Sequence, residues 1–252
     1  MRASALVAAV TLMLGIVGSA FGQGLGYSIW EQPTGEKESI ASFVGHTGLA
    51  TIPSALVGPP QSLQVFAHWT NTNWQIGTEE QDLWAWGASA AITGNIEVYA
   101  LRLQNVVESA GSRQTFEDET VVGAKYNVDI GRWTQNPDAP QLAVGVWDIA
   151  NEVNRAYYVA LTKELHLREP EGPSDLVVTL GFGNNELNDG ALDGFFAGVE
   201  FAPMPRVRLQ AEYDAEDFNF AARLFPTRNL SIDVASMDSN LCVGATYRIG
   251  YK

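Results

Sequence analysis

Hydrophobic and polar residues alternate without a break in the last stretch of the chain, from Leu241 to Tyr251. One parity carries Leu241, Val243, Ala245, Tyr247, Ile249 and Tyr251, and the other carries Cys242, Gly244, Thr246, Arg248 and Gly250. A period of two places these sets on opposite faces of a β-strand. A strand of an outer-membrane barrel needs this pattern, because one face meets lipid and the other meets the lumen.

Similar runs recur every 10 to 20 residues from position 61 onward, separated by turn-rich pieces. They predict twelve strands at Ser62–Trp69, Leu83–Ile92, Ile96–Leu103, Val121–Ile130, Gln141–Ile149, Arg155–Leu167, Leu176–Phe182, Phe195–Ala202, Val207–Tyr213, Phe218–Phe225, Leu230–Met237 and Leu241–Tyr251. An even number of strands suits a closed barrel of the bacterial type. We therefore predict an all-β fold, a closed antiparallel up-and-down transmembrane β-barrel of about 12 strands spanning residues 61–252.

The connections between these strands are unequal in length. Long polar pieces are expected on the outer side at Thr70–Asp82, Asn105–Thr120 and Gly183–Asp193, and tight inner turns at Thr93–Asn95, Pro203–Pro205 and Pro226–Asn229. Long outer loops with shorter inner turns are typical of outer-membrane barrels.

The N-terminal residues have the features of a secretory signal. Arg2 precedes an apolar run from Ala5 to Val17, and small residues flank a predicted cleavage site after Gly22. We expect residues 1–22 to be a cleaved signal peptide and the mature chain to reach the outer membrane. Residues 23–60 then form a separate N-terminal segment, for which a plug, a short helix near Glu36–Phe43 and an edge strand all remain open.

Composition narrows the choice of function. The net charge of −14 argues against a nucleic-acid surface, and the single Cys242 cannot form an internal disulfide. The low charged fraction of 17% fits a chain with a lipid-facing half.

Charged residues fall on the polar parity of the last strands, at Glu200, Arg208, Glu212, Arg223, Asp233 and Arg248. An arginine facing lipid at the bilayer midplane costs about 2–4 kcal/mol, so this face is predicted to line the lumen. The Pro203–Pro205 turn is expected to place Glu200 opposite Arg208, with the other charges neighbours only diagonally. Such a lining suits either a selective water-filled pore or a narrow barrel filled by paired charges.

Seven tryptophans are present, and five lie near expected strand ends: Trp69, Trp84, Trp86, Trp133 and Trp147. An interfacial aromatic girdle explains them. A platform for stacking sugars is the alternative.

Catalytic signatures are weak. The sequence lacks a Gly-x-Ser-x-Gly elbow, and its three histidines show no metal-ligand spacing. A pairing of His68 with Ser89 on the next strand is the best candidate for catalysis. We expect a protein that is not an enzyme and that has no cofactor, metal site or catalytic residue.

Two segments resemble the YjbH-type family of outer-membrane proteins associated with exopolysaccharide production and export. The first segment contains Gly45, Thr47, Gly48, Leu49, Pro53 and Ala55, and the second contains Glu212, Tyr213, Asp214 and Asn219 within residues 212–220. The resemblance implies an outer-membrane barrel that works beside polysaccharide export proteins. Members of the family are usually longer, and many carry a lipid-attachment cysteine that is absent near this cleavage site.

The sequence thus favours a non-enzymatic, monomeric outer-membrane barrel that is an accessory in exopolysaccharide export or surface assembly. A small-solute porin-like channel with a charged lumen is the alternative, and an outer-membrane hydrolase is a third. A secreted β-sandwich is the alternative fold. The expected partners are outer-membrane lipids and the barrel-insertion machinery, which would read Tyr247, Ile249 and Tyr251.

Overall fold

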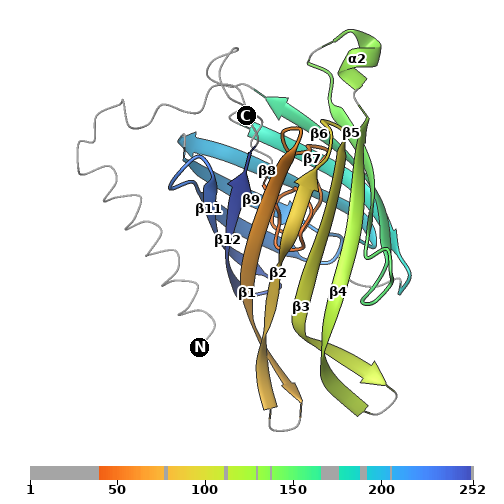
Figure 1. Cartoon of the computed structure of the whole chain (residues 1–252), viewed down its shortest axis with the longest axis vertical. Helices are drawn as coiled ribbons and strands as arrows, with labels where there is room; N and C mark the ends of the chain where they lie inside the picture. Colours follow the sequence, from red (N-terminus) through yellow and green to blue (C-terminus); the bar gives the residue numbers. More distant parts are fainter. Residues whose placement is uncertain are drawn as a thin grey trace, which may run out of the picture.

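A computed structural model describes residues 40–250, apart from 77–78, 111–112, 129, 137, 166–175, 188–191 and 205. Within these residues twelve strands, each antiparallel to its neighbours, form a closed barrel (Figure 1). The strands are β1 (Ser62–Ile76), β2 (Glu79–Ala91), β3 (Ile96–Ala110), β4 (Arg113–Val128), β5 (Gln141–Trp147), β6 (Ala156–Leu165), β7 (Leu176–Asn185), β8 (Gly194–Met204), β9 (Val207–Tyr213), β10 (Phe218–Leu224), β11 (Leu230–Met237) and β12 (Asn240–Ile249). The first and last strands pair from Leu63↔Ile249 to Thr70↔Cys242, which closes the sheet and confirms the predicted fold class.

Polar side chains of the wall face inward and are buried, whereas apolar side chains face outward and are exposed, which is the reverse of a soluble protein. In β12 the polar-parity residues Cys242, Thr246 and Arg248 are buried, whereas Val243 and Tyr247 are exposed. A β-sandwich would bury its apolar faces between two sheets, so that alternative is wrong. The apolar outer face is the surface that a lipid bilayer covers.

The exposed aromatic residues gather toward the two ends of the wall. Tyr126 and Tyr247 lie near the end at which β1 begins and β12 ends, and Trp84, Tyr157 and Phe182 lie toward the other. Aromatic girdles at both interfaces are a property of membrane barrels. The girdle explanation is wrong for Trp147, which faces inward.

Two hairpins extend well beyond the rim of the barrel, at the bottom of Figure 1. β1 pairs with β12 only as far as Thr70, but with β2 as far as Ile76, and the β3–β4 ladder continues to Ala110↔Arg113. The predicted outer loops Thr70–Asp82 and Asn105–Thr120 are therefore largely strand. Strand pairing continues there although most of these residues are polar, which is why their sequence predicts loops.

One short helix, α2 (Ile130–Thr134), lies in the connection between β4 and β5 at the opposite end. Among the described residues, none of the helices is both long and apolar enough to cross a membrane.

Residues 40–58 lie inside the barrel, where the orange trace in Figure 1 passes between the walls. Most of them are buried, and only the isolated bridges Ala41↔Thr47 and Gly48↔Pro53 give them regular pairing. We call residues 40–58 the plug. It is not a wall strand, so the barrel closes with twelve strands.

Candidate functional site

The contact between the plug and the lumen wall is the most elaborate polar arrangement in the described part of the chain. Wall side chains from many strands point inward and bind the peptide groups of the plug. A segment without its own sheet or helix must satisfy its buried N–H and C=O groups in this way.

The first attachment involves Thr47, Glu97 on β3 and Lys125 on β4. The Glu97 carboxylate accepts hydrogen bonds from the Thr47 backbone N–H at 2.7 Å and from its hydroxyl at 2.5 Å. Lys125 donates to the carbonyl oxygens of Thr47 (2.9 Å) and Leu56 (2.7 Å), and its Nζ lies 3.4 Å from Glu97. The side chains of Lys125 and Glu97 are 0% and 1% exposed. This attachment is thus a buried ion pair that also binds the plug.

The second attachment centres on Glu212 of β9. Its carboxylate accepts from the backbone N–H groups of Ala50 (3.0 Å), Thr51 (2.7 Å) and Ile52 (3.4 Å), and from the Thr51 hydroxyl (2.5 Å). Asn219 on β10 donates to Glu212 and, at 2.7 Å, to Asp214. The plug therefore supplies most of the donors that stabilise this buried carboxylate.

Single hydrogen bonds fix the rest of the plug. Gln64 accepts from Ala41 N–H, and Arg223 donates to the Ala41 carbonyl. The remaining bonds join Thr162 to Ala55 N–H, Asn127 to the Ala55 carbonyl, and Trp147 to the Val44 carbonyl. Contacts from β1, β4, β5, β6 and β10 thus surround the plug on all sides.

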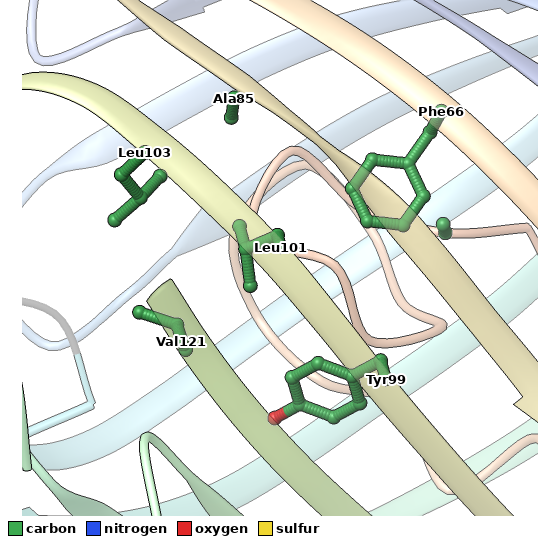
Figure 2. Close-up of a cluster of buried hydrophobic side chains, with 7 residues drawn as sticks. Phe66, Ala85, Tyr99, Leu101, Leu103 and Val121 are labelled. Atoms are coloured by element: carbon green, nitrogen blue, oxygen red, sulfur yellow. The ribbon is translucent and has the colours of Figure 1, made fainter. Parts of the chain in front are cut away.

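Apolar contacts complete the seat of the plug. Ala41 packs with Phe66, Tyr99 and Leu101, and Figure 2 shows the side chains from neighbouring strands that make up this cluster. Two further clusters lie elsewhere around the plug. Leu49 and Ile52 pack with Tyr158 and Phe196, and Phe43 and Ala50 pack with Ala221, Ala235 and Cys242.

Several of the aromatic side chains in the seat lie across a glycine on the adjacent strand. Tyr99 is paired with Gly123, Tyr158 with Gly145, and Phe196 with Gly181. A Cβ at any of these three glycines would lie 2.1–2.3 Å from the ring. Each ring therefore lies flat along the wall and turns its other face to the lumen.

The resemblance motif of the sequence lies within the plug. Gly45 has φ +96°, and a Cβ there would press on Leu101, Phe66 and Tyr99. A Cβ at Gly48 would lie 2.2 Å from the Ile52 carbonyl oxygen, across the turn closed by Pro53. Thr47 and Leu49 supply the polar and apolar contacts given above, and Ala55 is wholly buried. The motif is thus the sequence of a segment shaped to fit the lumen.

The charged residues expected in the lumen lie on the inward face. Arg208, Glu212, Arg223, Asp233 and Arg248 are buried, and Glu200 is half-buried. Their neighbours differ from the expectation. The β8–β9 hairpin pairs Met204 with Val207, so its turn is not centred on Met204 as expected. Glu200 therefore lies opposite Gln210, although Arg208 Nε still reaches it at 3.6 Å. Arg223 lies directly opposite both Asp233 and Arg208, rather than diagonally, and forms a 2.5 Å ion pair with Asp233.

The residues predicted for barrel insertion and those of the second resemblance motif do not share one location. Tyr247 and Ile249 face outward, and Tyr251 is outside the described residues. Tyr213 is half-buried and packs against the exposed Phe218, with ring centroids 5.1 Å apart. Asp214 accepts from the N–H groups of Glu216 and Asp217, which shapes the β9–β10 turn.

The candidate catalytic pair does not form. The β1–β2 register places Ser89 opposite Gln64, whereas His68 lies opposite Ala85. Gln64 and His68 are four residues apart on one strand, or about 13 Å. His68 instead lies over Gly244 and stacks against Phe66 at 5.2 Å.

Two central residues, Glu97 and Lys125, were missed by the sequence reasoning. In the predicted strand Ile96–Leu103 both parities carry apolar residues, because Tyr99, Leu101 and Leu103 share the inward face of Glu97. That face carries apolar residues since it packs on the plug rather than on water. A broken alternation beside an acidic residue was the available signal.

His46 is the plug residue whose protonation is most affected by its surroundings. Its ring is fully buried between Tyr99 and Tyr158, with centroids at 5.9 and 6.1 Å, and its Nδ1 is bonded to the Ser42 hydroxyl. Burial, together with the nearby charge of Lys125, lowers the pKa of His46 from 6.5 to about 3. A seated plug therefore holds this histidine neutral.

Comparison with solved structures finds proteins that resemble this chain weakly. The KdgM porin resembles it with a TM-score of 0.45 and 9% identity, over 76% of this chain and 99% of the porin. The outer membrane protein Omp33 of Acinetobacter baumannii has a TM-score of 0.37 and 8% identity, over 75% of this chain and 98% of Omp33. An outer membrane channel from Pseudomonas putida F1 has a TM-score of 0.37 and 12% identity, over 77% of this chain and 97% of the channel. No curated protein matches the sequence significantly.

A model of a protein family also matches the chain. The model of the YjbH family, described as exopolysaccharide biosynthesis protein YbjH, matches residues 40–252. The matched region begins with the first residue of the plug and includes every strand of the wall. This chain belongs to the YjbH family of exopolysaccharide-related proteins.

Proposed function

We propose that this protein is a plugged outer-membrane barrel that acts, without catalysis, as an accessory in the export or surface assembly of exopolysaccharide. In the resting state it is not an open porin. The family description supports the polysaccharide role, and the apolar outer face supports the membrane location. The expected partners are outer-membrane lipids, the insertion machinery and proteins of polysaccharide export.

The plug is the observation that carries this proposal. Glu97 and Glu212 hold it from opposite parts of the wall, and three apolar clusters pack around it. A twelve-stranded barrel is intermediate between small packed barrels and wide porins, so one segment suffices to fill much of its interior. A lumen occupied in this way suits a regulated or structural component better than a free diffusion pore.

A genetic experiment tests the polysaccharide role. The source bacterium lacking this gene is expected to secrete less exopolysaccharide, and expression of the wild-type chain is expected to restore it. A His68→Ala variant should restore secretion as well, because the role requires no catalytic base. Unchanged secretion in the deletion strain would sink the proposal, and failure of His68→Ala alone would favour the hydrolase.

The small-solute channel is the second candidate, and the charged inner wall favours it. Arg208, Arg223 and Arg248 lie toward the end of the barrel where β1 begins, with Glu200 and Asp233 beside two of them. Planar-bilayer conductance of the refolded mature chain separates the candidates. A folded but silent barrel is expected, whereas steady steps altered by charge reversal at Arg208 would favour the channel.

A further inference from the structure

Two buried ion pairs of the lumen wall would remain if the plug left, although Glu212 would lose its plug donors. Glu97 stays 3.4 Å from Lys125, and Arg223 stays 2.5 Å from Asp233. Thr162 likewise keeps a 2.9 Å bond to Thr179. A buried charge is costly chiefly when its partner is removed, and these partners belong to the wall. Departure of the plug therefore exposes a polar surface that is largely satisfied.

The seat of the plug also presents flat aromatic faces. Tyr99, Tyr158 and Phe196 each lie over a cross-strand glycine, so one face of each ring is covered and the other is turned inward. Plug residues now occupy those inward faces. His46 lies against Tyr99 and Tyr158, and Leu49 and Ile52 pack with Phe196.

Each of these rings has polar groups beside it on the same face. Glu97 precedes Tyr99 by two residues on β3, and Thr162 follows Tyr158 by four on β6. Glu212 lies opposite Gly198, two residues after Phe196. Flat rings flanked by carboxylates and hydroxyls suit a pyranose ring, because its C–H face is attracted to the negative face of an aromatic ring and its hydroxyls need hydrogen-bond partners.

The charges of this seat are close to balanced, which bears on the kind of sugar. Glu97 and Asp233 are paired with Lys125 and Arg223, and Glu212 is held by neutral donors. A strongly anionic or cationic chain would gain little from such a surface.

We propose that the seat of the plug is a binding track for an uncharged stretch of oligosaccharide, which the plug and the glycan occupy in turn. This inference rests on the proposed polysaccharide role and adds to it a site and a sugar class. In this proposal the plug can leave the lumen. While it is seated, its backbone forms the hydrogen bonds to the wall that sugar hydroxyls would otherwise form.

The test uses the full mature chain in planar bilayers, with plug release driven from the plug itself. Gly48→Val places its side chain against the Ile52 carbonyl and leaves the wall unchanged. Gly45→Val, at φ +96°, is an independent second variant. The matched control is Gly94→Val, in a turn where a Cβ meets only Pro60 at 3.6 Å. Heat-modifiable gel mobility establishes that each variant is folded.

We expect the wild type and Gly94→Val to be silent and both plug variants to conduct. Maltohexaose should then block the Gly48→Val current, and a uronic-acid hexamer should block it much less. Adding Tyr158→Leu should raise the half-blocking maltohexaose concentration at least fivefold, whereas Trp133→Leu, exposed on α2, should leave it unchanged.

Four outcomes would overturn the inference. They are folded plug variants that stay silent, a current that maltohexaose does not block, a block indifferent to Tyr158→Leu, and a stronger block by the uronic-acid hexamer. None of them bears on whether the deletion strain secretes exopolysaccharide, so the two proposals fail separately.

Discussion

Glu97 and Glu212 both bind the plug, but their surroundings in the wall differ. Each is a buried carboxylate that accepts hydrogen bonds from plug N–H groups. Glu97 also has a cation in the wall, Lys125 at 3.4 Å, whereas the described partners of Glu212 are plug donors and the Asn219 amide. One carboxylate is stabilised with or without the plug, and the other depends on it. Glu212 is therefore the attachment that decides whether the plug stays.

Removal of the Glu97 partner is expected to have the largest effect. Lys125→Met leaves a carboxylate buried without its cation, at a cost of about 3–5 kcal/mol. The double variant Glu97→Gln/Lys125→Met should recover at least half of that loss, since no buried charge remains. Urea unfolding of the refolded barrel in detergent measures both. A double variant no more stable than the single one would show that the ion pair is not the cause.

Glu212→Gln should come next and should act on the plug more than on the wall. Losing two charge-assisted hydrogen bonds costs about 3 kcal/mol, which corresponds to roughly 100-fold faster amide exchange at residues 50–52. Hydrogen-exchange mass spectrometry gives this rate. Glu200→Gln is the matched control, since its described partners Arg208 and Gln210 belong to the wall. Equal acceleration in both variants would argue against a special role for Glu212.

Acidification should weaken the seat through His46. The pKa of this histidine is about 3 in the seated plug and near 6.5 when released. The released form thus binds a proton first as pH falls. The stabilisation is fully present above pH 6.5 and declines toward pH 3, and the part lost by pH 5 is about 2 kcal/mol. The difference in plug exchange between wild type and His46→Phe isolates it. A difference that does not vary between pH 7 and 5 would contradict the assignment.

The smallest expected effect is at Thr162, which serves one end of the plug. Thr162→Val keeps the shape but removes the acceptor for Ala55 N–H, at a cost of about 1 kcal/mol. Exchange should rise about fivefold at residue 55 and remain unchanged at residues 50–52. A uniform rise over the whole plug would mean that the two attachments are not separable.

The wall could be predicted from the sequence because lipid imposes a strict rule. Val207–Tyr213 and Leu230–Met237 were predicted with the bounds that the structure shows, since every second residue must be apolar there. This alternation ends at the rim of the barrel, so the sequence predicts loops for the projecting parts of β1–β4. The alternation of apolar and polar residues also fails where inward-facing side chains pack on the plug instead of facing water, as at Tyr99 and Leu101. The partners of Glu97 and Glu212 could not be predicted, because they lie 50 and more than 160 residues away.

The closeness of the plug to β1 has a consequence for assembly. Only residues 59–61 separate the plug from the first strand, and Ser62 Oγ donates to the Pro59 carbonyl at 2.6 Å. β1 is also the strand that β12 must join to close the cylinder. Because this short connection keeps the plug beside the seam, we expect the joining of β12 to β1 to enclose it. We therefore expect chain connectivity to favour an order of insertion in which the plug is in place before the wall is complete.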